Sequence, residues 1–182
     1  KVLEVTANDG TKKDYLAKHI IIATGSRSRE LPNLKQDGKN IIGYREALSL
    51  PKQPKSILIV GTGAIGVEFA YFYHSMGAEV TLVEYEPRIV PREDDEIGKE
   101  LEKVFKKKGI GVMTSSSVEN VTVGKNGCEV EIKTAAGVEK KQVEVVLSAV
   151  GIQSNIENIG LEDLGIKTEK GKIVVDAYYQ TN

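Results

Sequence analysis

The alternation of apolar and polar positions divides the first third of the chain into short elements. Lys1 to Thr6 alternates apolar and charged residues, and the turn-forming Asn8-Asp9-Gly10 follows, which predicts a β-hairpin. The apolar run from His19 to Ala23 predicts a strand buried in a sheet. Residues 28–55 carry three prolines among polar side chains and predict a connection, with one short helix at Tyr44 to Leu48. A domain boundary is expected within this connection.

The next stretch has the pattern of two consecutive strand-helix units. Ser56 to Val60 is a continuous apolar run typical of a strand buried on both faces. Ala64 to Met76 predicts a helix that ends at Gly77, and Glu79 to Glu84 predicts a second strand. Asp94 to Lys108 has apolar residues at helical spacing, with acidic residues at its start and lysines at its end, as the helix dipole favours. The basic end of this segment is interpreted as a solvated helix terminus.

The last third predicts short strands. The expected strands are Gly111 to Thr114, the alternating segments Val118 to Val123, Cys128 to Thr134 and Val138 to Gln142, the buried run Val143 to Val150, and Lys172 to Val175. Residues 153–171 predict a loop with weak helical character. The whole order predicts an α/β fold with a Rossmann-like parallel sheet and helices, in which an antiparallel three-stranded meander replaces one crossover helix.

Composition narrows the class of protein. The 182 residues are 40% hydrophobic and 28% charged, typical of a globular protein, and no apolar run approaches the ~18 residues of a membrane span. The net charge of −1 argues against nucleic acid and membrane partners and favours a small ligand. Cys128 is the single cysteine, so an internal disulfide is excluded, and with two histidines no metal site is expected. No secretory signal pattern opens the sequence, and a cytoplasmic protein is expected.

Glycine is over-used, at 18 residues, and three glycines form a GxGxxG motif at Gly61, Gly63 and Gly66. The motif follows a predicted buried strand directly and opens a predicted helix, which is the arrangement of a dinucleotide-binding turn. Gly61 is expected to permit the tight turn, Gly63 to let a pyrophosphate approach the backbone, and Gly66 to let the helix pack close to the strand. The pyrophosphate would bind free N–H groups at the helix N-terminus.

Acidic residues near this motif indicate which nucleotide binds. Glu84 ends the next strand, about 20 residues on, where a carboxylate accepts hydrogen bonds from a ribose and repels the extra phosphate of NADP. Glu86 adds to this repulsion. Arg88 leaves the NADP alternative open, although it can equally pair with local acids, and NAD is favoured. Glu68, in the first turns of the helix, is either a ligand for the cofactor or an acid placed favourably by the helix dipole.

These residues resemble the flavoprotein pyridine nucleotide-disulfide oxidoreductases, and within that family most closely the enzymes that oxidise dihydrolipoamide. The segments that carry the resemblance are GTGAIGVEFA (61–70), VTLVEYEPRIVP (80–91), HIIIATGS (19–26), SAVGIQSNIENIGLEDLGI (148–166) and KIVVDAYYQTN (172–182). It covers nearly the whole chain. One departure is Ile152-Gln153-Ser154-Asn155, where many relatives have two arginines and a proline.

The resemblance implies roles for particular positions. NAD would be held at its pyrophosphate by Gly61, Thr62, Gly63, Ala64, Ile65 and Gly66, at the adenosine ribose by Glu84, at the adenine by Val118, and at the nicotinamide end by Glu68 and Gly151. Thr24, Gly25 and Ser26 match a turn near FAD, although the FAD site would be incomplete in this chain. No catalytic residue is expected here, because the redox cysteine pair and the catalytic His-Glu pair of the family are absent.

The resemblance also implies that the chain is the middle of a longer enzyme. Residues 1–33 and 152–182 would be remnants of an FAD domain, and residues 34–151 the NAD-binding domain. FAD would be a cofactor of the complete enzyme only, and the partners would be the remaining FAD and dimerisation domains and the components of a 2-oxoacid dehydrogenase complex. Two alternatives stay open, namely a glutathione-, mercuric- or CoA-disulfide-type reductase and a non-catalytic NAD-responsive module.

Overall fold

A computed structural model describes all 182 residues, which form two compact units. The inner unit comprises Arg27–Gln153, and the outer unit comprises Lys1–Ser26 together with Ser154–Asn182. The division of the chain into an NAD-binding domain at residues 34–151 and two FAD-domain remnants stays a prediction.

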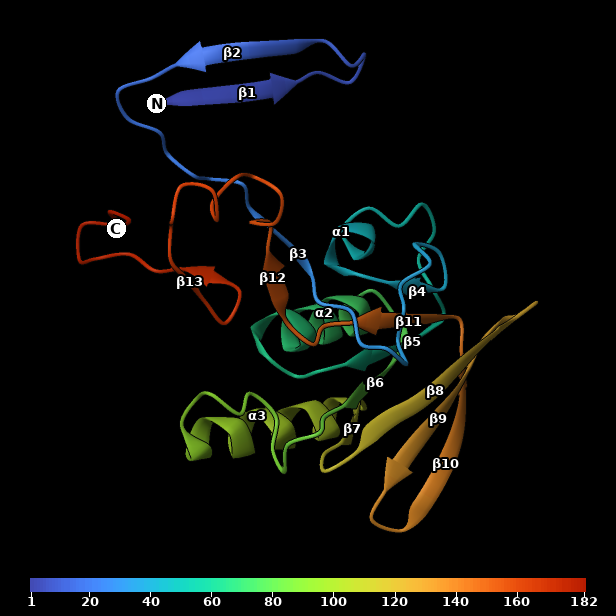
Figure 1. Ribbon diagram of the computed structural model, residues 1–182. Helices are drawn as coiled ribbons and strands as arrows, with labels where there is room; N and C mark the ends of the chain where they lie inside the picture. Colours follow the sequence, from blue (N-terminus) through green and yellow to red (C-terminus); the bar gives the residue numbers. More distant parts are fainter. The chain divides into compact units, whose positions relative to one another are not determined.

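The inner unit is built on a five-stranded parallel sheet in the order β4-β11-β5-β6-β7 (Figure 1). Its strands are β4 (Ile41–Ile42), β5 (Ser56–Val60), β6 (Glu79–Val83), β7 (Gly111–Met113) and β11 (Val145–Ser148). The expected α/β fold with a parallel sheet is confirmed. The sequence missed the two-residue strand β4, and β11 is shorter than expected because Val143 belongs to the preceding antiparallel strand.

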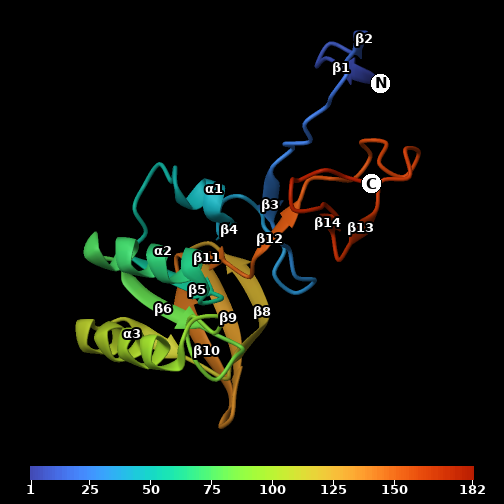
Figure 2. The same cartoon turned by 90° about the vertical axis from the view of Figure 1, so that its left-hand side faces the viewer.

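Three helices lie in the inner unit: α1 (Tyr44–Ala47), α2 (Ala64–Ser75) and α3 (Asp95–Lys108). The Asp94 side chain caps α3 by accepting the Glu96 N–H at 2.8 Å, and Gly109 ends the helix in the left-handed conformation, with φ 94°. Figure 2 shows α2 and α3 on the same side of the parallel sheet. No helix has both the length and the apolar character needed to cross a lipid bilayer.

The opposite face of the parallel sheet is covered by the predicted meander. It consists of β8 (Ser117–Gly124), β9 (Gly127–Thr134) and β10 (Gly137–Val143), paired antiparallel with β9 in the middle. Alternate residues of the central strands face the two sides. Leu58 and Val146 pack with Val130 and Ile132 of the meander, whereas Ile57 and Leu147 pack on the helical side. This two-sided burial explains why β5 and β11 are apolar throughout.

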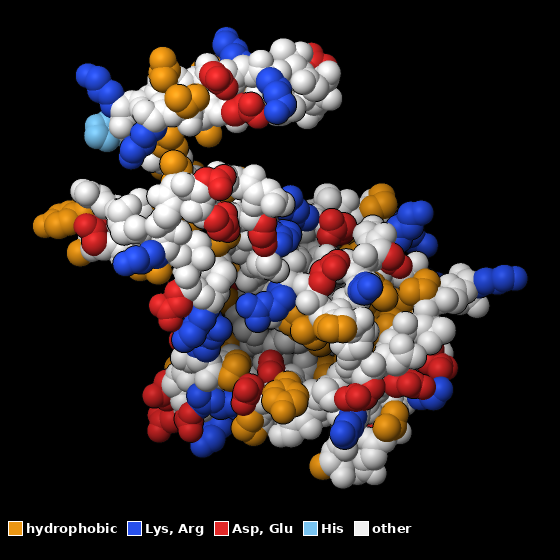
Figure 3. Space-filling view, in the orientation of Figure 1, with side chains coloured by type: hydrophobic (Ala, Val, Ile, Leu, Met, Phe, Trp, Pro, Cys, Tyr) orange, Lys and Arg blue, Asp and Glu red, His pale blue; other side chains and the backbone are white.

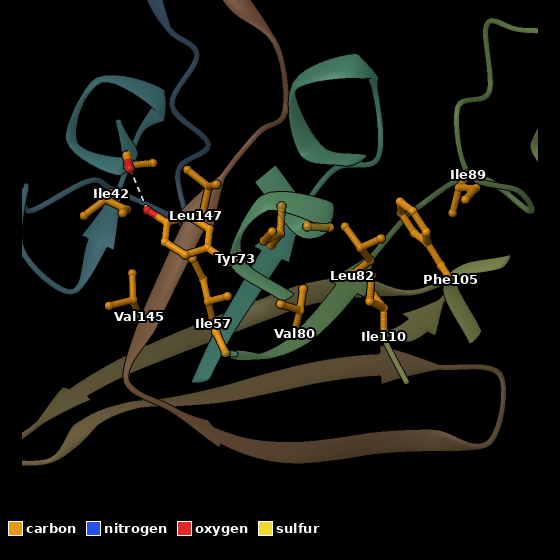
Figure 4. Packing of buried hydrophobic residues seen from close by; sticks show 14 of the residues in the cluster. Ile42, Ile57, Tyr73, Val80, Leu82, Ile89, Phe105, Ile110, Val145 and Leu147 are labelled. Carbon is orange, nitrogen blue, oxygen red and sulfur yellow. Dashed lines mark hydrogen bonds between the residues drawn. The ribbon is translucent and has the colours of Figure 1, made fainter. Parts of the chain in front are cut away.

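The helical side of the sheet holds the larger hydrophobic cluster, drawn in Figure 4. Tyr73 of α2 lies in this cluster and is 3% exposed. Its hydroxyl donates to the carbonyl oxygen of Ala47 at 2.6 Å, which satisfies the buried phenol and ties α2 to α1. The packing fixes the start of α2 above the end of β5, where the glycine motif lies.

Cys128 lies on the meander side of the sheet, fully buried, and its thiol donates weakly to the Asn40 carbonyl oxygen at 3.8 Å. Burial, together with the nearby charge of Asp37, raises the pKa of this thiol from 9.0 to about 11. The folded chain therefore keeps a proton that the unfolded chain loses first, and stability falls as pH rises from about 9 to 11. We expect this one thiol to remove roughly 2–3 kcal/mol of unfolding free energy across that range.

Urea unfolding of the parent and of Cys128→Ala at pH 8 and pH 11 checks this expectation. Other groups titrate in the same range, so the measured quantity is the difference between the two proteins. The parent should lose more stability than the variant, and equal losses would show that the thiol does not contribute.

The outer unit contains two short hairpins. β1 (Val2–Thr6) pairs with β2 (Lys12–Leu16), and β13 (Thr168–Glu169) pairs with β14 (Lys172–Ile173). Two further short strands, β3 (Ser26–Ser28) and β12 (Ile152–Ser154), pair with each other. The hairpin predicted at the start of the chain is confirmed.

The sequence prediction of a buried strand in the outer unit is wrong. Residues 19–23 were expected to form a buried strand, but they adopt no regular structure, and Ile21 is 91% exposed. An apolar run becomes a central strand only when neighbouring strands pair with it on both edges, and no strand pairs with this one. Residues 153–171 are looped, as expected, and their weak helical character is one isolated turn, in which the Leu164 N–H donates to the Gly160 carbonyl oxygen at 3.3 Å and the Gly165 N–H to that of Glu162 at 3.0 Å.

Candidate functional site

The glycine motif forms the sharp turn between β5 and α2. Gly61 has φ 94°, and its N–H donates to the Val83 carbonyl oxygen at 2.9 Å. A Cβ at Gly61 would lie 2.6 Å from the carbonyl oxygen of Ala149, which is too close for any side chain. A Cβ at Gly66 would overlap the carbonyl oxygen of Gly61. Gly66 therefore permits the close approach of α2 to the end of β5, and Gly61 permits the sharp turn beside the segment that follows β11, as the motif predicts for the turn and for the helix packing.

Gly63 has a different environment. It caps the N-terminus of α2 with φ −65° and ψ −177°, an extended conformation that any residue adopts. It is exposed, and a Cβ built on it would meet no atom within 4 Å. No side chain caps the helix, so the first N–H groups of α2 have no side-chain acceptor at this cap. The open space above Gly63 and the uncapped helix end fit an anionic group such as a pyrophosphate.

Glu84 follows β6 at the same edge of the sheet and is 7% exposed. Its Oε2 accepts the Thr62 N–H at 2.8 Å and the Thr62 hydroxyl at 2.6 Å, and its Oε1 accepts the Glu86 N–H at 2.9 Å. The carboxylate is thus fixed against the glycine turn. The sequence predicted that Glu84 would lie near this turn because the carboxyl ends of adjacent parallel strands meet at one edge.

The direct link between Thr62 and Glu84 was not anticipated. Thr62 was expected to bind pyrophosphate with the rest of the motif, but its side chain is fully buried, with 0% exposure. Its carbonyl oxygen also accepts the Val90 N–H at 3.0 Å, which joins the turn to the loop after β6. The one signal in the sequence is the hydroxyl residue at the second motif position, where the turn itself requires no side chain.

Arg88, which left the NADP alternative open, is engaged elsewhere. Its guanidinium forms an ion pair with Asp95 at the start of α3 and donates to the Pro91 carbonyl oxygen at 2.7 Å. The side chain therefore secures the loop between β6 and α3. This agrees with the interpretation that Arg88 pairs with local acids.

The other residues assigned to NAD differ in accessibility. Glu68 of α2 is exposed, as is Ala64, while Ile65 is half-buried. Gly151 follows β11, is exposed, has φ 111°, and has open space where a Cβ would stand. Val118 packs into the core on the meander side and keeps only 6% exposure, so little of its side chain could contact an adenine. All of these residues belong to the inner unit, and their roles toward NAD stay predictions.

The turn assigned to FAD lies in the outer unit. Gly25 has φ 72°, and its carbonyl oxygen accepts the Asn155 N–H at 3.0 Å, while the Asn155 amide donates to the Thr24 carbonyl oxygen at 3.1 Å. Thr24 and Gly25 are exposed and Ser26 is half-buried. These contacts hold the turn against the returning chain, and its relation to FAD stays a prediction.

The face of the molecule shown in Figure 3 carries charges of both signs. On the face shown in Figure 3, acidic and basic side chains are interspersed and form no broad patch of one sign.

The strand-turn-helix arrangement with its acidic strand end defines a dinucleotide-binding fold of the Rossmann type. The family model of the pyridine nucleotide-disulphide oxidoreductases matches residues 1–182, and the chain belongs to this family. The resemblance stated from the sequence is confirmed. The family implies a pyridine nucleotide and a flavin as cofactors.

Two curated relatives illustrate the similarity. The dihydrolipoyl dehydrogenase of Zymomonas mobilis is 47% identical over 179 residues, which is 98% of this chain and 38% of that protein. The dihydrolipoyl dehydrogenase of Rhizobium etli is 48% identical over 169 residues, which is 92% of this chain and 35% of that protein. The chain thus spans somewhat more than a third of the length of these relatives.

Solved structures agree with the sequence relatives. LpdA from Mycobacterium tuberculosis superposes with a TM-score of 0.87 at 29% identity, covering 98% of this chain and 38% of that one. An NAD-dependent persulfide reductase from A. fulgidus superposes with a TM-score of 0.84 at 28% identity, covering 100% of this chain and 34% of that one. The fold of this chain is therefore found in several disulfide and persulfide reductases.

Proposed function

We propose that this chain is the NAD(H)-binding part of an FAD-dependent dihydrolipoyl dehydrogenase. The observation that carries the proposal is the edge of the parallel sheet where the open turn at Gly63 meets a fixed carboxylate at Glu84. The similarity to dihydrolipoyl dehydrogenases supports the choice of substrate within the family.

In this proposal each part of the dinucleotide has its own partner. The N–H groups at the start of α2, beyond Gly63, would bind the pyrophosphate, and Glu84 would accept hydrogen bonds from the adenosine ribose. Glu68 and Gly151 would lie at the nicotinamide end. When bound, the nicotinamide supplies a position that accepts or donates a hydride, and the residues of this chain only bind and orient it.

The remainder of the enzyme follows from the same proposal. In the complete enzyme, electrons from dihydrolipoamide would reach NAD through a disulfide and FAD, and Thr24, Gly25 and Ser26 would lie near the flavin. The partners would be the FAD and dimerisation domains and components of a 2-oxoacid dehydrogenase complex. The 182-residue chain alone would bind NAD(H) without turnover. The cytoplasmic location expected from the sequence stays a prediction.

Calorimetric titration of the 182-residue chain with NADH and NADPH tests the proposal. We expect NADH to bind more tightly, because the fixed carboxylate at Glu84 favours a ribose diol and repels a 2′-phosphate. In Glu84→Gln the charge is removed while the size is kept. NADH should then bind about tenfold more weakly, which corresponds to the loss of one charged hydrogen bond. NADPH should bind more tightly than it does to the parent, because the charge that repels its 2′-phosphate is gone.

The comparison of the two nucleotides also defines what would contradict the proposal. Equal or tighter binding of NADPH by the parent chain would reject the assignment to NAD. An unchanged preference in Glu84→Gln would reject the role of Glu84 even if NADH binds. Circular dichroism of both proteins verifies that the substitution leaves the fold intact.

A further inference from the structure

All three polar backbone and side-chain groups of Thr62 are engaged within the protein. Its N–H and its hydroxyl both donate to Oε2 of Glu84, at 2.8 and 2.6 Å, and its carbonyl oxygen accepts the Val90 N–H at 3.0 Å. With 0% exposure, the side chain offers no surface to a ligand. Any effect of Thr62 on a bound nucleotide must therefore pass through its partners.

Glu84 is placed so that such an effect can occur. A carboxylate oxygen accepts about two hydrogen bonds, so Oε2 is saturated by Thr62, while Oε1 accepts the Glu86 N–H and keeps capacity for another donor. The backbone of Glu84 is fixed as well, since its N–H donates to the Met113 carbonyl oxygen and its carbonyl oxygen accepts the Ser116 N–H, both at 2.8 Å. The remaining freedom lies in the side chain.

We infer that Thr62 is a positioning residue that sets nucleotide specificity by orienting the carboxylate of Glu84. The inference rests on the proposed function, because it assigns the ribose of NAD(H) to Glu84. A glutamate side chain has three rotatable bonds, and binding a ribose requires one arrangement of them. The two donors of Thr62 fix that arrangement before the nucleotide arrives, so less conformational entropy is lost on binding.

Loss of the hydroxyl should affect the two nucleotides differently. Without it, Oε2 keeps only the backbone N–H of Thr62, and the carboxylate can turn toward water. NADH then loses a preorganised acceptor for its ribose hydroxyls. NADPH does not benefit from this acceptor, because its 2′-phosphate is repelled by the same charge. A purely structural defect in the turn would weaken the binding of NADH and of NADPH by the same factor.

The test compares Thr62→Val, which removes the hydroxyl at nearly constant shape, with Thr62→Ser, which retains it. Thr81→Val is the matched control, because Thr81 is a buried threonine of the strand that leads to Glu84 and is not among the donors to its carboxylate. Dissociation constants for NADH and NADPH are measured by calorimetry on each 182-residue protein. Thr62→Ala serves as a second variant without the hydroxyl if Thr62→Val does not fold.

We expect Thr62→Val to bind NADH about tenfold more weakly, which is the order of the cost of ordering one flexible side chain on binding, and to bind NADPH within about twofold of the parent. Thr62→Ser and Thr81→Val should keep the parent preference. The inference is overturned if Thr62→Val binds NADH as tightly as the parent or more tightly, or if its affinities for NADH and NADPH fall by the same factor. A parent chain that binds no NADH would reject the proposed function itself, and this inference with it.

Discussion

Replacing Gly63 with alanine is expected to leave the fold intact and to weaken NADH binding by about 100-fold. A Cβ at this position meets no atom of the protein within 4 Å, and the backbone conformation suits any residue. The added methyl group would instead occupy the space through which a pyrophosphate approaches the N–H groups of α2. Losing one or two hydrogen bonds to a charged group amounts to about 3 kcal/mol, which is the expected 100-fold.

Gly124→Ala is the matched control for this substitution. Gly124 lies in β8 of the meander, has no positive φ, and a Cβ there would meet its nearest atom at 3.8 Å, an ordinary contact. Both variants should unfold at urea concentrations close to that of the parent, and only Gly63→Ala should lose affinity for NADH. Normal binding by Gly63→Ala would show that the pyrophosphate does not lie over this turn.

Replacing Gly66 with alanine is expected to destabilise the fold by about 2–4 kcal/mol. The new Cβ would overlap the carbonyl oxygen of Gly61, a backbone atom that cannot rotate away, so α2 would have to move off β5. Alanine favours a helix over glycine by about 1 kcal/mol, which offsets only part of this penalty. Gly66 is buried and Gly63 is exposed. We therefore expect the glycine at position 66 to be needed for stability and the glycine at position 63 to be needed for NADH binding.

Urea unfolding of Gly63→Ala and Gly66→Ala, measured side by side with the parent, separates these roles. Gly66→Ala should unfold at a markedly lower urea concentration. If the two variants were equally stable, the close packing of α2 on β5 would not be what requires glycine at position 66.

Much of the inner unit could be predicted because its elements are specified locally. The strands predicted at Ser56–Val60 and Glu79–Glu84 match β5 and β6 to within one residue, since residues buried on both faces of a sheet are mostly apolar or β-branched. Residues 19–23 carry the same kind of signal and form no strand, because strand formation also depends on neighbours. The short β4 lies below the length at which periodicity is detectable.

The candidate site shows the same division. The requirement for glycine at position 66 follows from the motif, because a strand-turn-helix of this length brings Gly66 against the Gly61 carbonyl oxygen in any sequence. At Gly61 only the positive φ is local, since the atoms that a Cβ would meet belong to Ala149 and the segment after β11. The Thr62 hydroxyl bond to Glu84 depends on the register of β5 against β6 and on two side-chain rotamers. The burial of Val118 depends on a bulge between Val118 and Asn120 and on packing against the sheet. Neither is encoded in a local pattern.

The position of β11 in the sheet has a consequence for how the inner unit assembles. β11 pairs with both β4 and β5, although it follows β5 by roughly 90 residues, so a long loop must close before β4 is joined to the rest of the sheet. The three strands of the meander, β8, β9 and β10, are consecutive in the chain and joined by tight hairpins, so they can pair independently of β11. During synthesis we expect the edge of β5 to stay bare until Ser148 has left the ribosome, which makes the half-made sheet the stage most exposed to aggregation.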